Sequence, residues 1–295
     1  MEENILEKYK KAGSITATIR EDLLKKIKPG MKILEIAEYV DAEIEKRGGK
    51  PAFPVNISIN EITAHDTPRA NDDREVKEGD LVKIDIGVHV DGYIGDMAFT
   101  YCSKPSPLIK ANQEVLEEAI KILKPGITVA EIGKTIQDAA EKRGFGLITN
   151  LTGHTLDKYV FHGQPSILNV DNDSDYVFKE GDVLALEPFL TESNSTVKES
   201  GIIEIYRYMQ DRPVRLAEAR QILAKARDEF KQLPFAKRWL YKKFSPVKVA
   251  LSMRQLEEAM AVETYPVLKN RNNNPVSQAE HTIVLIKNGH VVTTR

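Results

Sequence analysis

Cysteine is almost absent from this chain, in which Cys102 is the one thiol among 295 residues. A single cysteine excludes an intrachain disulfide framework, so any metal site must be built from oxygen and nitrogen ligands. No apolar run approaches the roughly 18 residues of a membrane-spanning helix, and the N-terminal segment is charged and amphipathic rather than signal-like. We therefore expect a cytoplasmic protein with no membrane partner.

The chain also lacks an excess of charge of either sign. Its 42 Lys and Arg residues nearly balance its 44 Asp and Glu residues, which gives a formal net charge of −2. This balance provides no broad attraction to nucleic acid or to acidic membranes, although it leaves local basic patches open. A hydrophobic fraction of 41% and a charged fraction of 29% are ordinary for a globular protein of one large or two smaller domains.

What the chain does contain is acidic residues inside apolar, strand-like segments. Asp85 interrupts residues 81–87 and Asp96 interrupts residues 93–99, with Asp91-Gly92 as a turn between the two segments. A hairpin brings both acids toward one site. Burial of a carboxylate is strongly unfavourable unless a positive charge compensates it, and Lys83 is the one basic residue at a comparable place nearby. The pattern indicates either a strand-end ion pair with Lys83 or a divalent cation.

A repeat organises the first two thirds of the sequence. Residues 28–48 recur at 124–144 with a constant offset of 96 residues, and each copy has a Pro-Gly turn, an amphipathic helix and a final glycine. The segment Lys-Glu-Gly-Asp at 77–80 recurs at 179–182, which makes Asp85 and Glu187 equivalent positions of two half-units. Two copies are too few for a solenoid. The repeat therefore predicts a pseudo-symmetric domain with a site at the junction of its halves.

The spacing of apolar residues predicts the remaining elements. Helices are expected at 5–28 and 107–123, and strands at 81–90, 93–101, 183–190, 201–209 and 281–294. Residues 217–230 and 247–262 have a helical pattern of a different character, which suggests an inserted helical subdomain. The predicted domains are thus 1–209 with 271–295, and the insertion 210–270.

The order of five metal-ligand types in the chain resembles that of the pita-bread metallopeptidases of family M24: Asp85, Asp96, His154, Glu187 and Glu280. Surrounding motifs are similar to those of type 2 methionine aminopeptidases in their archaeal form: Pro51-Ala52-Phe53-Pro54, Ala64-His65, Gly153-His154 with His162, Glu187-Pro188-Phe189 and Glu280-His281-Thr282. The resemblance covers almost the whole chain. It implies an α+β fold of pseudo-two-fold, pita-bread type with an inserted, winged-helix-like subdomain. The implied activity is removal of the initiator methionine when the second residue is small.

The resemblance also implies a site. Asp96 and Glu280 would bridge two divalent cations (Co, Fe, Mn or Zn), Asp85 would bind one of them, and His154 with Glu187 would bind the other. Glu187 would further act as general base, and His65 and His162 would hold the substrate and donate a proton at the scissile amide. Phe53, Phe161 and Tyr265 would line the methionine pocket. The implied partner is a peptide or nascent-chain N-terminus, with a transient ribosome contact, no specific nucleic acid and a monomeric state.

Some residues depart from the family pattern. Asp66 follows His65 where an aromatic residue is common, and its carboxylate would raise the pKa of His65 or bind the substrate amine. Met97 stands where threonine is usual, which removes a hydroxyl beside Asp96. Residues 163–169 differ in order from the family, so the shape of that loop is open. These departures concern substrate preference more than metal binding.

Two other functions stay open at this level. One is a catalytically inactive homologue that binds ribosome or RNA, although such a loss normally appears as broken ligands, and all five are intact. The other is a proline-specific aminopeptidase P or prolidase, which shares the same ligand types. His89, His281 and His290 are assigned no role in the site.

Overall fold

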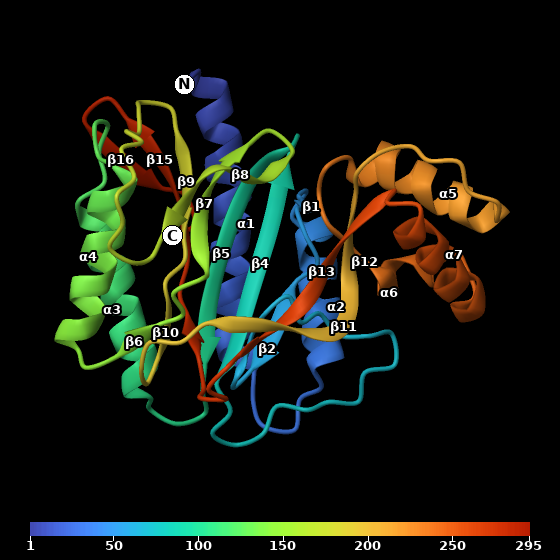
Figure 1. Cartoon of the computed structure of the whole chain (residues 1–295), viewed down its shortest axis with the longest axis horizontal. Helices are drawn as coiled ribbons and strands as arrows, with labels where there is room; N and C mark the ends of the chain where they lie inside the picture. Colours follow the sequence, from blue (N-terminus) through green and yellow to red (C-terminus); the bar gives the residue numbers. More distant parts are fainter.

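Antiparallel strands run through the centre of the molecule, with helices packed around them (Figure 1). A computed structural model describes all residues, 1–295. The helices are α1 Glu3–Lys26, α2 Ile33–Lys46, α3 Pro107–Lys121, α4 Val129–Lys142, α5 Ala217–Lys225, the π-helical turn η1 Ala226–Phe230, α6 Lys237–Leu240 and α7 Pro246–Glu258. The strands are β1 Lys50–Pro51, β2 Asn56–Ile59, β3 Ile62–Ala64, β4 Val82–Val90, β5 Tyr93–Tyr101, β6 Gly146–Leu147, β7 Thr152–Asp157, β8 Val160–Leu168, β9 Val183–Leu186, β10 Phe189–Thr191, β11 Val197–Tyr208, β12 Phe235–Ala236, β13 Val262–Asn270, β14 Ser277–Gln278, β15 His281–Ile286 and β16 Gly289–Val292.

The repeat seen in the sequence appears as two equivalent substructures. In the Pro-Gly turn before α2, Gly30 N donates a hydrogen bond to Val76 O at 2.8 Å. In the corresponding turn before α4, Gly126 N donates to Phe178 O at 2.8 Å. Both glycines have left-handed backbones, with φ of 86° and 96°, which explains why glycine stands at this point of each copy. The predicted pseudo-symmetry of the two halves is confirmed.

Two predicted strands are shorter than expected. The expectation of one strand at 183–190 is wrong, because Glu187 and Pro188 separate β9 from β10. Proline lacks the N–H that a continuous ladder requires. The expectation of one strand at 281–294 is also wrong, since β15 and β16 form an antiparallel hairpin in which Ile286 pairs with Gly289. Residues 163–168, whose shape the sequence left open, belong to β8.

The two halves meet where β15 lies beside β5. The Thr282 hydroxyl accepts from Asp96 N and donates to Asp96 O, both at 2.8 Å, and Glu280 N donates to Ala98 O at 2.9 Å. On its other edge β15 pairs with β9, which pairs in turn with β7. Strands from distant parts of the chain are thereby fixed side by side at the junction.

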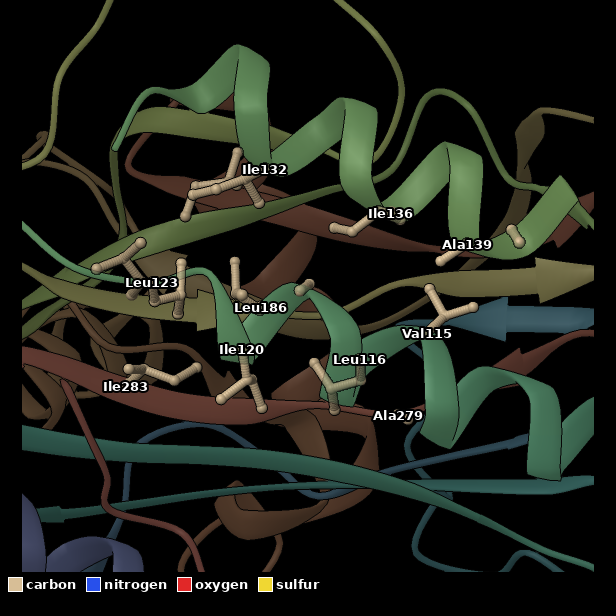
Figure 2. Packing of buried hydrophobic residues seen from close by; sticks show 14 of the residues in the cluster. Val115, Leu116, Ile120, Leu123, Ile132, Ile136, Ala139, Leu186, Ala279 and Ile283 are labelled. Carbon is tan, nitrogen blue, oxygen red and sulfur yellow. The ribbon is translucent and has the colours of Figure 1, made fainter. Parts of the chain in front are cut away.

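Apolar helix faces cover the two halves separately. Helices α3 and α4 pack on strands of the second half through residues such as Val115, Ile120, Ile132, Ile136 and Leu186 (Figure 2). Helices α1 and α2 contribute to a different cluster with β2 and β4. Each amphipathic helix buries one stripe. A further apolar cluster contains residues of both halves, among them Ile94, Val183 and Val284.

Helices α5, α6 and α7 form a helical unit at the end of the molecule opposite α3 and α4 (Figure 1). This unit has its own hydrophobic cluster, which includes Ile222, Phe235, Met253 and Leu256. The division of the chain at 210–270 remains a prediction, and β13, at the end of that range, pairs with both β11 and β3. No helix has the length and apolar character needed to cross a membrane.

Candidate active site

A cavity of about 280 Å³ opens at the junction of the two halves. Its lining contains all ten residues that the sequence analysis assigned to metal binding, catalysis or substrate binding: Phe53, His65, Asp85, Asp96, His154, Phe161, His162, Glu187, Tyr265 and Glu280. These residues come from segments spread between positions 53 and 280 of the chain. The fold therefore brings together a set that is scattered in the sequence.

We call Asp85, Asp96, His154, Glu187 and Glu280 the floor of the cavity. Strand register positions the first two, because Asp85 on β4 faces Ala98 on β5, and Asp96 faces Gly87. Their side chains thus lie on one face of the hairpin as diagonal neighbours. His154 lies on β7, Glu187 directly follows β9, and Glu280 directly precedes β15.

Gly87 has a specific role beside this pair. A Cβ atom at this position would lie 2.1 Å from Cε1 of Phe53, a separation that real atoms do not adopt. The missing side chain therefore makes room for the Phe53 ring next to the floor.

The floor residues approach one another closely. One ligand atom from each of Asp96, His154 and Glu280 lies within 4.8 Å of the others. His154 Nε2 is 3.5 Å from Glu187 Oε1 and 3.7 Å from Asp96 Oδ2. Asp96, His154 and Glu280 are also no more than 5% exposed, so these contacts lie away from solvent.

Most carboxylate oxygens of the floor have no hydrogen-bond partner in the protein. Both side-chain oxygens of Asp96 and of Glu280, and Oδ1 of Asp85, are buried with no hydrogen-bond partner. Burial raises the pKa of Asp85 to about 7. Burial, together with repulsion from neighbouring carboxylates, raises the pKa of Asp96, of Glu187 and of Glu280 well above the usual range.

These observations fit a divalent metal site. Four carboxylates and one imidazole line one cavity and form a hard, oxygen-rich ligand set, in which several carboxylate oxygens have no hydrogen-bond partner. Burial lowers the pKa of His154 to about 4, so the imidazole is neutral and able to ligate near neutral pH. Cations between these groups would remove the cost of burying like charges together.

The expected alternative partner of Asp85 is occupied elsewhere. Lys83 is buried, and its Nζ donates to Asn60 O at 2.9 Å and to Val276 O at 3.0 Å. The interpretation of Asp85 as a strand-end acid paired with Lys83 is therefore wrong. Both acceptors are backbone carbonyls, one of them from a segment far along the chain.

Sequence reasoning missed Gln278, which contacts the floor. Its Nε2 donates to Asp85 Oδ2 at 3.3 Å and to Glu187 Oε2 at 3.4 Å, and so connects the two equivalent acids of the half-units. Asn169, the last residue of the segment left open, donates from Nδ2 to Glu187 O at 3.0 Å. The one available signal was that Gln278 stands two residues before Glu280.

Aromatic and imidazole rings form the rest of the wall. The rings of Phe53 and Phe161 lie 4.4 Å apart, and those of Phe161 and His162 lie 4.0 Å apart. The Tyr265 ring lies edge-on to His65 at 5.4 Å. An apolar surface from the two phenylalanines thus adjoins the polar side of the cavity.

His65 has a defined orientation. Its Nδ1 lies 3.3 Å from Pro266 O, and because a carbonyl only accepts, Nδ1 carries the proton. Burial lowers the pKa of His65 to about 4, so the ring is neutral and its Nε2 is an acceptor. Burial also lowers the pKa of His162 well below its usual value.

Asp66 does not act on His65 or on the cavity as expected. Its carboxylate accepts from Arg74 at 2.7 and 3.0 Å, and it is absent from the cavity lining. The pKa of His65 is lowered rather than raised. The expectation that Asp66 raises the pKa of His65 is therefore wrong. The Asp66 carboxylate already accepts two hydrogen bonds from Arg74, so it is not free to bind a substrate amine.

Met97 is fully buried and does not line the cavity. Alternation along β5 points its side chain to the face opposite Asp96. The Thr282 hydroxyl is instead the side-chain group that contacts the backbone of Asp96.

Three further histidines lie outside the lining, as expected. His89 Nδ1 accepts from Gly92 N at 3.1 Å, and His281 and His290 contact Thr294 Oγ1 and Leu123 O. The cavity holds the other three histidines of the chain, His65, His154 and His162.

Comparison with known proteins agrees with this geometry. The sequence matches the family described as metallopeptidase family M24 over residues 7–231. It is 44% identical to a methionine aminopeptidase of Archaeoglobus fulgidus over 296 residues, which covers 100% of each chain. Among solved structures, a methionine aminopeptidase from Rickettsia prowazekii superposes with a TM-score of 0.73 at 23% identity, covering 100% of this chain and 98% of that one. A thermophilic Arx1 superposes with a TM-score of 0.87 at 20% identity, covering 99% and 91%. The chain belongs to the metallopeptidase family M24.

Proposed function

We propose that this protein is a methionyl aminopeptidase that hydrolyses the first peptide bond of peptides and nascent chains beginning with methionine. The observation that carries the proposal is the floor, in which four carboxylates and one imidazole meet with unpartnered oxygens beside an apolar wall. The 44% identity to archaeal methionine aminopeptidases over the whole chain supports the same activity.

The five floor residues would hold two divalent cations of the Co, Fe, Mn or Zn type. Asp96 and Glu280 would offer both side-chain oxygens to the cations, because neither oxygen of either residue has a hydrogen-bond partner. Asp85 would complete one cation site, and His154 with Glu187 the other. Bound cations supply Lewis acidity, which activates a water molecule and polarises the scissile carbonyl.

Glu187 is assigned as the general base. Its backbone is fixed by Asn169, and its carboxylate is held by Gln278 at one oxygen and lies near His154 at the other. General-base catalysis requires a carboxylate within reach of the attacking water, and Glu187 lines the cavity. Glu187 would take the proton of the attacking water and return it toward the leaving amine.

The two remaining histidines would handle the scissile amide. His65 presents Nε2 as an acceptor, which suits the N–H of the bond that is cut. His162, whose ring lies 4.7 Å from that of His154, is assigned to donate a hydrogen bond to the developing oxyanion. A neutral imidazole serves either purpose.

Phe53 and Phe161 would receive the methionine side chain, with Tyr265 at the edge beside His65. The paired rings offer an apolar surface that selects by size and shape, and such pockets discriminate modestly between similar side chains. The limited volume of the cavity favours a small second residue.

We further propose that the protein acts in the cytoplasm as a monomer and reaches its nascent-chain substrates through transient contact with the ribosome. The near-neutral net charge supports a transient encounter better than a stable complex with nucleic acid.

Release of methionine from Met-Ala-Ser tests the proposal directly. The protein is stripped with a chelator, the cations are added back singly, and free methionine is measured. Xaa-Pro and Xaa-Pro-Xaa peptides serve as the comparison for prolidase and aminopeptidase P activity. Metal-dependent release of methionine with little cleavage at proline is expected, and no release with any of the four metals would refute the proposal.

A further inference from the structure

Any methionyl aminopeptidase must recognise a free α-amino group, and this inference rests on the function proposed above. Within the part of the substrate that enters the cavity, only two groups donate hydrogen bonds: the α-amine and the N–H of the scissile bond. The methionine side chain and the carbonyl oxygen donate none. His65 Nε2 suits the scissile N–H, so the α-amine needs another acceptor.

Asn56 offers such an acceptor. It lies on β2 directly opposite Asp85 of β4, and it lines the cavity although it is only 6% exposed. Its Nδ2 donates to Pro54 O at 2.8 Å, which fixes the side-chain amide in one orientation. The carbonyl oxygen Oδ1 is buried with no hydrogen-bond partner. A buried, unpartnered acceptor is costly to keep, which suggests that it has a ligand.

Two other sets of acceptors in the lining are already committed, the Asn150 amide and the four carboxylates. Asn150 Oδ1 accepts a hydrogen bond from Val197 N at 2.8 Å, and Asn150 Nδ2 donates one to Val197 O at 3.2 Å. The four carboxylates belong to the floor and would face the cations. Asn56 Oδ1 is therefore the buried amide oxygen of the lining that is free to bind an N–H donor.

We propose that Asn56 Oδ1 accepts a hydrogen bond from the α-amino group of the N-terminal residue and thereby selects substrates with a free amine. Its place fits this role, because Asn56 pairs with Asp85 and lines the same cavity as Phe53 of the apolar wall. The methionine side chain and its amine branch from one carbon atom and would reach both groups together. A neutral amide also adds no further negative charge to the four carboxylates.

The test compares two ligands that differ only at the amine. Dissociation constants of L-methionine and of 4-(methylthio)butanoate are measured by calorimetry on the metal-loaded protein, for the wild type and for Asn56→Leu. Leucine keeps a similar volume and removes the acceptor. Asn56→Ala is a second variant in case leucine disturbs folding, and Ser58→Ala is the control, since Ser58 lies on β2, is buried without a partner and does not line the cavity.

Asn56→Leu should weaken methionine binding on the order of tenfold to a hundredfold, while binding of 4-(methylthio)butanoate changes about twofold or less. Metal content should stay at the wild-type value, and Ser58→Ala should bind both ligands like the wild type. Equal weakening of both ligands, no weakening of either, or loss of metal from both Asn56 variants would overturn the assignment. If the wild type releases no methionine from Met-Ala-Ser, the proposed function itself fails, which is a separate result.

Discussion

Two sides of the cavity are built by different means. The floor is placed by backbone ladders, because β4 and β5, and β7, β9 and β15, fix its residues by register. The wall residue His65 begins a loop, residues 65–74, which we call the His65 loop. Backbone bonds from Ile57 N to Asp66 O at 2.6 Å and from Ile33 N to Arg74 O at 3.1 Å hold this loop, and side-chain bonds add to them. Asp66 binds Arg74, and the Thr67 hydroxyl donates to Val55 O at 2.8 Å and accepts from Arg238 of α6.

The difference teaches where single substitutions should matter. Register is shared among many backbone bonds, so the floor keeps its shape when one side chain changes but loses its chemistry. The His65 loop depends also on a few side chains, and its residue His65 has a left-handed backbone with φ of 62°. Substitutions in this loop other than at His65 should lower stability more than they lower catalytic activity.

Asp96→Asn should give the largest effect. Loss of a bridging carboxylate is expected to lower metal content and to reduce methionine release by at least about a thousandfold. In excess chelator the variant should unfold at a higher temperature than the wild type, because one buried like charge is gone. Metal analysis and thermal unfolding check both parts, and a variant with full metal and a rate within tenfold would break the assignment of the floor.

Glu187→Gln should remove the general base while the fold remains. We expect kcat to fall about a hundredfold to a thousandfold, with a circular dichroism spectrum like that of the wild type. Gln278→Ala is the control variant. It removes the hydrogen bond to Glu187 Oε2 and should lower kcat less than Glu187→Gln does. Activity of Glu187→Gln within tenfold of the wild type would show that another group takes the proton.

His162→Ala tests the assignment of His162, in the wall of the cavity, to the substrate. Turnover should fall about a hundredfold while metal content stays unchanged, because His162 is assigned to the substrate and not to a cation. Metal content is measured on the same preparation. Parallel loss of metal and turnover would instead make His162 a ligand.

Asp66→Asn tests the His65 loop. Loss of the paired bonds to Arg74 should lower the free energy of unfolding by about 1 to 2 kcal/mol and change kcat/KM less than about fivefold. Asp72→Asn is the matched control, because Asp72 also binds Arg74, at 2.7 Å, but lies farther along the loop from His65. If Asp66→Asn alone reduces turnover a hundredfold with unchanged stability, the loop has a chemical role after all.

His89→Gln should have the smallest effect on activity and should change only the pH dependence of stability. Burial lowers the pKa of His89 to about 4, so its contribution to stability is present above about pH 6.5 and is lost as the pH falls toward 4. The stability lost by the wild type between pH 7 and pH 5 should exceed that lost by the variant by about 2 kcal/mol. Denaturant unfolding at both pH values measures this, with unchanged methionine release at pH 7.5; an equal loss in both proteins would contradict it.

The sequence was most informative where it was periodic. The 96-residue offset predicted two equivalent halves, and the hairpin around Asp91-Gly92 correctly placed Asp85 and Asp96 on neighbouring strands. Such signals are local or repeat themselves, so no knowledge of distant contacts is needed to read them.

The sequence was least informative where a polar side chain has partners far along the chain. Lys83 was paired with the nearest acid, but its true acceptors include Val276 O. Gln278 and Asn56 were overlooked, because an amide side chain carries no charge that would mark it as costly in a strand. Their meaning depends on which strands become neighbours, and that is a property of the folded molecule.

The place of Glu280 near the end of the chain has a consequence for biosynthesis. Asp85 and Asp96 leave the ribosome early, but β15, which lies between β5 and β9, is made after both of these strands. During translation the two halves can each begin to collapse, while the carboxylates that later meet at their junction remain exposed to solvent and apart from one another. The full set of five proposed ligands is therefore available only after Glu280 has been synthesised.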